Sequence, residues 1–481
     1  MRKVQPRHMQ RTASGWYTNK WILLALIIGI IFIVVPSSLF LISKVDQKAV
    51  VKQKKVATAH LVHELEQTRF NNQAVSKKET VRHTSKPAQV MVLDENLPKE
   101  IQTSITQKLQ KIETSWRSSS DELLLSYIHI NPTFKNIEQV EAGITSYEWN
   151  TRNKAYEQKK QEKLPLSYRQ VTDNQLITSQ LFLKSEENLA AVHLATKQIL
   201  LDKLKPKSEV VDAILTLPAF TWDTPIAYHP DHLVVAVPAS GKLTEQTVDV
   251  PYQKIKCVLN PDYVDDKLLA TTTANQDSST KKIALTFDDG PNPTTTPKIL
   301  ATLKEKQIHA TFFQLGKNVA AHPELAKQVH DEGHEIGSHT YNHVQLNKAD
   351  EQTIQKEIVE TDRAIYQAMG ILPQLIRPPY GAVNTTVAKL AGRPIIQWDV
   401  DSRDWATKNA AKTLAQIQQT VSPNGIVLLH DIQPSTAAVL PQLIDWLKAQ
   451  GYEFVTVDQL LHSQEKPFHQ YFSQTDERTV S

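Results

Sequence analysis

The chain has 481 residues, more than one ordinary hydrophobic core accommodates, so two or three domains are expected. Its formal net charge of +3 at pH 7 gives no reason to expect nucleic acid as a partner. The single cysteine, Cys257, excludes an internal disulfide framework and a cysteine-rich metal cluster, so any metal site must use His, Asp or Glu.

Near the N-terminus, residues 21–42 form an uncharged apolar run, WILLALIIGIIFIVVPSSLFLI. A helix needs about 20 apolar residues to cross a bilayer, whereas the apolar region of a signal peptide is about 7–15 residues long and precedes a cleavage site. The basic residues before the run are Arg2, Lys3, Arg7, Arg11 and Lys20. Because the net charge after the run is weaker, residues 1–20 should stay in the cytoplasm. The run predicts an uncleaved single-pass anchor, with everything after it outside the membrane.

The next two segments differ in composition and hydrophobic pattern. Residues 43–118 are polar, with helical patterns around 57–65 and 97–112, and are interpreted as a helical stalk. Residues 119–262 combine short alternating runs with one amphipathic stretch, 187–205, which predicts a small α+β middle domain. The stretches FTWDTPIAYHPDHLVVAVPASG and VDVPYQKI resemble the C-terminal domain of RsiV-type anti-sigma proteins, a resemblance that carries no catalytic residue.

A predicted linker, residues 263–281, separates this domain from the last one, and residues 463–481 are interpreted as a tail. Between 282 and 462, apolar strand candidates alternate with amphipathic helical stretches. The strand candidates are residues 283–287, 310–315, 335–338, 375–378, 395–400, 426–429 and 454–457. This alternation predicts an α/β domain with a parallel sheet, and about seven strands favour a distorted, closed or nearly closed (β/α) barrel.

Polar residues follow most of these strands. They are Asp288 and Asp289 after the first strand, His339 and His343 after the third, Arg377-Pro378-Pro379-Tyr380-Gly381 at the fourth, Asp401 and Asp404-Trp405 after the fifth, and His430-Asp431 after the sixth. In a β/α barrel the C-terminal strand ends converge on the face where active sites are built. We therefore expect residues more than a hundred positions apart to lie together.

His339 and His343 are four residues apart, a spacing that aims both imidazoles at one point. A second pair with this spacing, His330 and His334, begins in the preceding predicted helix, so its position does not favour a site. One carboxylate from the first strand would complete a two-histidine, one-carboxylate metal site, and the other could stay free as a base. The alternatives are two surface or capping histidines and, for DDG, a solvated turn or helix cap.

Five motifs together resemble carbohydrate esterase family 4, the NodB-homology polysaccharide deacetylases. In order, they are TFDDGP (286–291), HTYNH (339–343), RPPYG (377–381), DSRDW (401–405) and IVLLHD (426–431). The resemblance covers about residues 281–462. The layout of anchor, stalk, middle domain and C-terminal domain is similar to that of membrane-anchored streptococcal peptidoglycan N-acetylglucosamine deacetylases.

This resemblance implies catalytic roles for four residues. Asp288 would be the catalytic base, held by a charge-assisted pair with Arg377. His430 would be the general acid, and Asp404 would support its protonated form.

The resemblance also implies a divalent metal, expected to be Zn²⁺, with Co²⁺ or another divalent ion as the alternative. Its implied ligands are Asp289, His339 and His343. Tyr380 would offer its backbone N–H to the oxyanion, while Trp405 and Leu428 would line the pocket for the acetyl methyl group. For these last two residues, an ordinary core position is the alternative.

The sequence as a whole predicts a metal-dependent enzyme that hydrolyses the N-acetyl group of N-acetylglucosamine in peptidoglycan. Alternative substrates are N-acetylmuramic acid, poly-N-acetylglucosamine, chitin-like oligomers and acetylated xylan. A non-catalytic wall-binding protein is a further alternative, but it predicts degraded motifs. The family implies that free amines make the wall more cationic and reduce its recognition by lysozyme-like hydrolases. The expected location is the surface of a Gram-positive cell, and the residues identify no protein partner.

Overall fold

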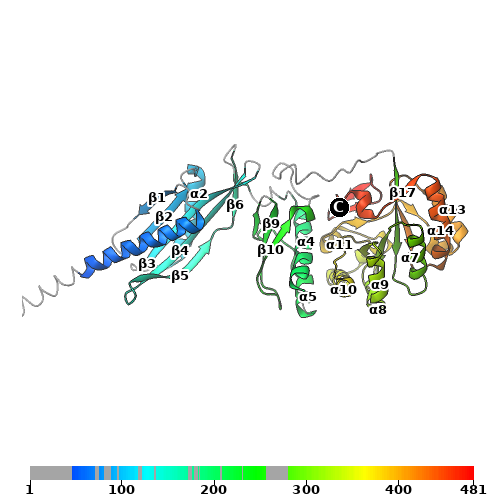
Figure 1. The fold of residues 1–481 in the computed structure, drawn as a ribbon, viewed down its shortest axis with the longest axis horizontal. Coiled ribbons are helices and arrows are strands. Elements are labelled where there is room, and N and C mark those ends of the chain that lie inside the picture. Colours follow the sequence, from blue (N-terminus) through cyan, green and yellow to red (C-terminus); the bar gives the residue numbers. More distant parts are fainter. Residues whose placement is uncertain are drawn as a thin grey trace, which may run out of the picture. The chain divides into compact units, whose positions relative to one another are not determined.

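The computed structural model describes residues 46–70, 75–80, 88–94, 97–116, 122–134, 137–171, 176–177, 183, 185–205, 208–229, 231–255 and 280–480. The predicted cytoplasmic segment, the predicted anchor at 21–42 and most of the predicted linker lie outside the described residues. Within the described ranges, no helix is both long and apolar enough to cross a membrane. The chain divides into two compact units, residues 1–130 with 141–164 and residues 131–140 with 165–481 (Figure 1).

The first unit combines two helices with a sheet. Its elements are a helix over residues 46–69, β1 (Val75–Thr80), β2 (Ala88–Asp94), α2 (Lys99–Ser115), β3 (Glu122–Phe134), β4 (Ile137–Asn150) and β5 (Ala155–Lys163). β2 pairs antiparallel with β1 and parallel with β3, and β4 pairs antiparallel with β5.

These strands correct the interpretation of residues 43–118 as a helical stalk. Val90 and Val92 alternate along β2, a period that places both on one sheet face. Both are buried in one core with Val62 and Phe70 from the N-terminal helical segment and Leu123 from β3. Residues 75–80 and 88–94 therefore belong to a folded sheet, and the predicted boundary at residue 118 falls inside the first compact unit.

The second unit begins with a small α+β part. Its elements are β6 (Ser167–Gln170), β7 (Leu176–Ile177), α4 (Glu186–Leu204), α5 (Ser208–Leu215), β8 (Ile226–Tyr228), β9 (His232–Val237), β10 (Gln246–Pro251) and the 3-10 helix η1 (Tyr252–Lys254). Strands β10, β9 and β8 form an antiparallel sheet. α4 confirms the predicted helix over 187–205, and its Leu189, Val192 and Leu200 share a core with Val235 and Val237 of β9.

The remainder of the second unit is the predicted α/β domain. Its strands are β11 (Lys281–Asp288), β12 (Thr311–Gln314), β13 (Glu335–Ser338), β14 (Ile395–Ile396), β15 (Val400–Asp401), β16 (Gly425–His430), β17 (Tyr452–Phe454), β18 (His469–Tyr471) and β19 (Glu477–Thr479). Its helices are α7 (Thr296–Glu305), α8 (Gly316–Ala321), α9 (Pro323–Asp331), α10 (Glu351–Met369), α11 (Thr385–Ala391), α12 (Asp404–Thr407), α13 (Ala410–Thr420), α14 (Pro434–Ala449) and α15 (Val457–Leu461), with 3-10 helices η3 (Leu346–Lys348) and η4 (Pro379–Gly381).

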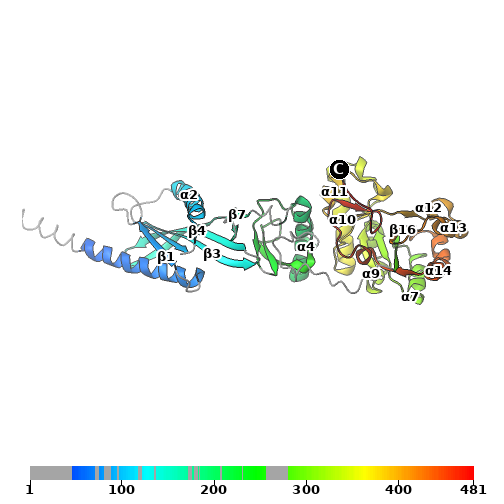
Figure 2. The same ribbon diagram turned by 90° about the horizontal axis from the view of Figure 1, so that it is seen from above.

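A parallel sheet in the order β13-β12-β11-β16-β15 forms the centre of this domain. Residues 283–288 of the central strand β11 are all buried, as expected for a parallel strand covered on both faces. Helices α7, α9, α10, α13 and α14 are arranged around the sheet (Figures 1 and 2). Leu285 and Phe287 of β11 pack in one core with Ile299 of α7 and Leu443 of α14.

Two predicted strands are shorter than expected. The fourth, residues 375–378, is reduced to single bridges from Ile376 to Ser338 and to Ile395, because Pro378 and Pro379 have no N–H to extend a ladder. The fifth is divided into β14 and β15. The structure therefore confirms an α/β domain with a parallel sheet but does not establish the predicted seven-stranded barrel.

The predicted tail is also structured. β18 pairs parallel with β14 and antiparallel with β19. Tyr471 of β18 is buried in a core with Leu375 and Ile396. The domain therefore extends beyond the predicted boundary at residue 462.

Candidate metal centre and active site

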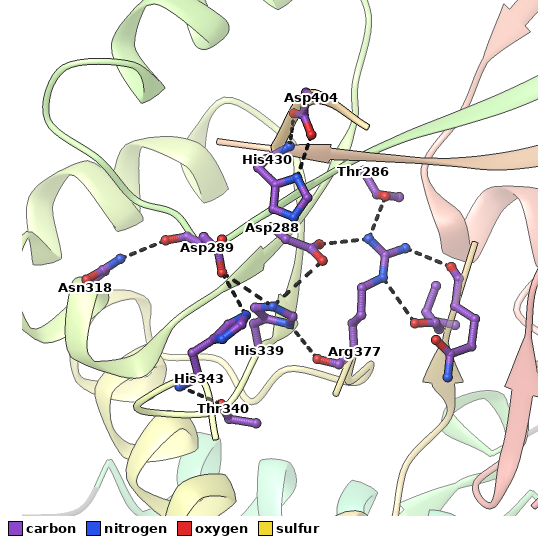
Figure 3. A network of polar contacts seen from close by, with 12 residues as sticks. Thr286, Asp288, Asp289, Asn318, His339, Thr340, His343, Arg377, Asp404 and His430 are labelled. Carbon is purple, nitrogen blue, oxygen red and sulfur yellow. Dashed lines mark hydrogen bonds and ion pairs between the residues drawn. The ribbon is translucent and has the colours of Figure 1, made fainter. Parts of the chain in front are cut away.

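The candidate site lies where parallel strands end, as the order of strands and helices predicted (Figure 3). Asp288 is the last residue of β11 and lies opposite His430, the last residue of β16. His339 directly follows β13, and the N–H of Arg377 donates to Ser338 O in that strand at 2.9 Å. Residues far apart in the sequence are therefore neighbours.

Asp289, His339 and His343 form one group whose potential ligand atoms all lie within 4.8 Å of one another. The Oδ1 atom of Asp289 is 3.5 Å from His339 Nε2 and 3.4 Å from His343 Nε2. This oxygen is buried and has no hydrogen-bond partner among the described residues. A buried, unpaired acceptor facing two ring nitrogens is an arrangement that a cation would satisfy.

The protonation of His339 also suits a metal ligand. Its Nδ1 lies 2.6 Å from Arg377 O, and because a carbonyl only accepts, Nδ1–H donates this bond. That leaves the lone pair on Nε2, which faces Asp289. Burial lowers the pKa of His339 to about 3, so the ring is neutral, as metal coordination requires. Two imidazoles and one carboxylate therefore fit a divalent transition metal ion such as zinc.

Asp288 lies beside this group and is only 3% exposed. Its Oδ1 accepts a hydrogen bond from Arg377 Nη1 at 2.8 Å, and its Oδ2 is 3.8 Å from His339 Nε2. Burial raises the pKa of Asp288, and the positive charge of Arg377 opposes that rise. The two neighbouring carboxylates thus have different surroundings: Asp289 faces both histidines, and Asp288 is bonded to an arginine.

Arg377 is fully buried and fixed by several partners besides Asp288. Its Nη1 also donates to Thr286 Oγ1 at 2.7 Å, Nη2 donates to Gln397 O at 2.9 Å, and Nε donates to Ile396 O at 3.1 Å. The guanidinium lies 4.2 Å from the ring centroid of Phe313. A planar guanidinium with this many fixed acceptors can hold Asp288 in one orientation.

His430 lies between Asp404 and Asp288 in Figure 3. Its Nδ1–H donates to Asp404 Oδ1 at 2.7 Å, and its backbone N–H donates to Asp404 Oδ2 at 2.7 Å. Burial alone would lower the pKa of His430, but the hydrogen bond and charge of Asp404 outweigh it and raise the pKa to about 9. His430 is therefore protonated at neutral pH, with Nε2–H available to donate.

The three predicted substrate-contacting residues differ in exposure. Tyr380, in η4, is 69% exposed, and its ring lies 4.8 Å from that of His343. Trp405, in α12 next to Asp404, is 48% exposed. An exposed aromatic ring beside a polar site can stack on an apolar ligand face. Leu428 is 5% exposed in β16, two residues before His430.

Three polar residues that carried no role in the sequence analysis support the site. Asn318 of α8 donates from Nδ2 to Asp289 O at 2.7 Å, where Asp289 has a φ of 73°. The N–H of Asp431 donates to Asp288 O at 2.8 Å, and Thr296 Oγ1 bonds to the Asp431 carboxylate at 2.7 Å. Burial raises the pKa of that carboxyl to about 7. Asp431 is the last residue of the IVLLHD motif, whereas nothing in the local sequence around Asn318 or Thr296 indicates a role.

Comparison with known proteins gives consistent matches. The family described as polysaccharide deacetylase matches residues 275–394. The chain is 40% identical over 248 residues to the peptidoglycan-N-acetylglucosamine deacetylase PgdA of Listeria monocytogenes, covering 52% of this chain and 53% of that protein. It is 34% identical over 237 residues to the peptidoglycan-N-acetylmuramic acid deacetylase PdaC of Bacillus subtilis, covering 46% of this chain and 51% of that protein. The chain thus spans about half the length of these two relatives.

A shorter relative is matched over most of its length. The chain is 40% identical over 189 residues to a peptidoglycan-N-acetylglucosamine deacetylase of Bacillus cereus, which covers 38% of this chain and 88% of that protein. The family match at residues 275–394 lies mainly in the C-terminal α/β domain.

Proposed function

The chain belongs to the polysaccharide deacetylase family, and from that membership we propose that it is a metal-dependent hydrolase of N-acetylglucosamine residues in peptidoglycan. The reaction adds water to the acetamide, breaks the bond between the carbonyl carbon and nitrogen, and yields acetate and a free amine. One observation carries this proposal. A candidate metal-binding group, formed by Asp289, His339 and His343, lies beside a buried carboxylate, Asp288, that accepts a hydrogen bond from Arg377.

We propose that Asp289, His339 and His343 hold the ion, with zinc as the first choice and cobalt or another divalent ion as the alternative. Such an ion, when bound, lowers the pKa of water and polarises a carbonyl group. Asp288 then accepts the proton of the attacking water. Because Oδ1 is bonded to Arg377, Oδ2 on the side of His339 is the atom available for that proton.

His430 supplies the proton that the leaving nitrogen needs. Its Nδ1–H is engaged by Asp404, so Nε2–H is the donor, and the amine departs with that proton. The backbone N–H of Tyr380 is proposed to stabilise the developing oxyanion, an effect typically worth about 3–4 kcal/mol per donor. Trp405 and Leu428 are proposed to border the acetyl methyl group.

Asp404→Asn should move the alkaline limb of the pH–rate profile to lower pH. His430 must be protonated to act as the acid, so activity is lost as pH rises through its pKa, about 9 in the wild type. Without the Asp404 charge, only the smaller effects of the Asp288 and Asp289 charges still oppose the lowering of that pKa by burial. We therefore expect the alkaline limb to shift by more than about one pH unit. Measuring kcat/KM across pH checks this. Asp331→Asn, which removes an exposed carboxylate of α9, should leave the limb in place.

We further propose that the enzyme is a single-pass membrane protein with its N-terminus inside and its catalytic domain facing a Gram-positive cell wall. The apolar run at 21–42 and the basic residues before it support this. By making the wall more cationic, the free amines would reduce its recognition by lysozyme-like hydrolases.

We also propose that the catalytic sheet is a distorted barrel. Ile395 forms a bridge to Ile376, and residues 400–401 pair with β16, so residues 395–401 contact strand segments on two sides.

Acetate release from purified peptidoglycan tests the proposed function. We expect the full chain, purified in detergent, to release acetate. Excess chelator should abolish this activity, and added zinc should restore it. Analysis of the product sugars should show glucosamine. Muramic acid instead would indicate the specificity named for PdaC, and acetate release only from another glycan or from acetylated xylan would replace the substrate. No acetate from any of these by metal-loaded protein would favour a non-catalytic wall-binding role.

A further inference from the structure

The loop that carries both candidate metal-binding histidines, residues 339–343, has an unusual backbone. Thr340 has a φ of 66° and His343 has a φ of 68°. Neither is glycine, and this left-handed region is unfavourable for residues with a Cβ atom. Such conformations persist only where surrounding contacts determine them, often at functional sites. The contacts that hold this loop therefore bear on where the two histidines lie.

The first residues of α8 form two backbone hydrogen bonds with this loop. The N–H of Gly316 donates to Thr340 O at 3.0 Å, and the N–H of Lys317 donates to Tyr341 O at 3.2 Å. Within the loop, the N–H of His343 donates to Thr340 Oγ1 at 3.1 Å. These bonds engage Thr340, Tyr341 and His343 but leave Asn342 to another partner.

That partner is Glu357 of α10, which uses both carboxylate oxygens on Asn342. The backbone N–H of Asn342 donates to Glu357 Oε2 at 2.7 Å, and Asn342 Nδ2 donates to Oε1 at 2.9 Å. Glu357 is 5% exposed. Within residues 280–480, no Lys, Arg or His nitrogen forms an ion pair with it, whereas the neighbouring acids Glu360 and Asp362 each pair with an arginine. A buried carboxylate needs hydrogen bonds to compensate for lost hydration, and Asn342 provides two.

The helix that presents Glu357 is fixed at both ends and along its length. Asp350 caps its N-terminus by accepting from Thr353 N at 2.7 Å, and Gly370, with a φ of 77°, ends it. Arg363, farther along the helix, donates to Asp212 of α5 at 2.7 Å. A polar group on a long, anchored helix can position a loop more accurately than one on another loop.

We propose that Glu357 is a positioning residue for the metal centre: by holding Asn342, it keeps His343 and His339 oriented towards Asp289. This inference rests on the proposed metal-dependent function and adds a residue outside the five motifs. Mutating a residue that orients metal ligands without binding the metal itself commonly weakens metal affinity by about 10–100-fold.

Glu357→Gln tests the proposal with little change in side-chain volume. The Gln carbonyl can accept one of the two bonds, but its NH₂ group then faces a second donor of Asn342. We expect zinc to bind about 10–100-fold more weakly, measured on the full chain in detergent by competition with a chromophoric chelator. The matched control is Glu360→Gln, the same change three residues on in α10, where the carboxylate bonds to Arg363 instead. The control should bind zinc like the wild type.

Asn342→Ala provides a second variant. It loses the Nδ2 bond but keeps the backbone bond to Oε2, so zinc affinity should fall less than in Glu357→Gln. Thermal unfolding of the metal-free proteins separates positioning from general stability. Wild-type zinc affinity in Glu357→Gln, with or without a lower melting temperature, would overturn the proposal. The proposed function fails separately, if zinc-loaded wild-type protein releases no acetate from any glycan tested.

Discussion

Replacing Asp288 by Asn is expected to leave the zinc content near the wild-type level and to lower kcat by about 10²–10⁴-fold, the usual contribution of a general base. Asn has nearly the same shape as Asp, and its carbonyl oxygen can still accept from Arg377, so the buried site should keep its packing. The amide cannot take a proton from water, however. Metal analysis of the purified variant, together with acetate release at saturating substrate, measures both effects.

The separation of the two effects distinguishes Asp288 from Asp289. Asp289→Asn should lose zinc, because Oδ1 of Asp289 is the oxygen that faces both histidines. If Asp288→Asn loses zinc while Asp289→Asn keeps it, the roles of base and ligand are reversed. Wild-type activity in Asp288→Asn would mean that another group accepts the proton.

His339→Ala is expected to lose both zinc and activity. The change leaves two of the three candidate ligands, and it also removes the donor to Arg377 O, the carbonyl of the arginine that holds the base. Zinc content should fall below about one tenth of the wild-type value after dialysis, and acetate release should fall to background. Elemental analysis and the acetate assay on one preparation check this result.

His330→Ala is the matched control for that variant. His330 has the same spacing to a second histidine, His334, but lies in α9 and belongs to no candidate ligand group among the described residues. It should retain wild-type zinc content and activity. Stoichiometric zinc in His339→Ala would exclude His339 as a required ligand.

The sequence predicted the neighbourhood of the site well because strand order decides which residues meet. Once β11, β13 and β16 are recognised as parallel strands, Asp288, His339 and His430 must approach one another at their C-terminal ends. The pairing of His430 with Asp404 followed from the family resemblance, and the structure places these two side chains 2.7 Å apart.

The residues that hold the loops of the site in place could not be predicted from local sequence patterns. Asn318 and Glu357 lie in helices where a polar residue ordinarily faces water, and only tertiary packing turns them towards the loops of the site. The strands in residues 75–94 were missed because the polar composition of the region dominated the short alternation in β2. The break between β14 and β15 depends on the competing partners β18 and β16, which are distant in sequence.

The pairing of β18 affects how a recombinant catalytic fragment should be designed. Tyr471 O of β18 accepts the backbone N–H of Gln397 at 2.8 Å, and Gln397 O in turn accepts Nη2 of Arg377. Tyr471 is therefore linked through Gln397, by two hydrogen bonds, to the arginine that orients the base. A gene fragment ending at residue 462 would omit this support, although it would contain every motif residue, so expression boundaries and proteolytic trimming at this end deserve the same care as mutations in the site.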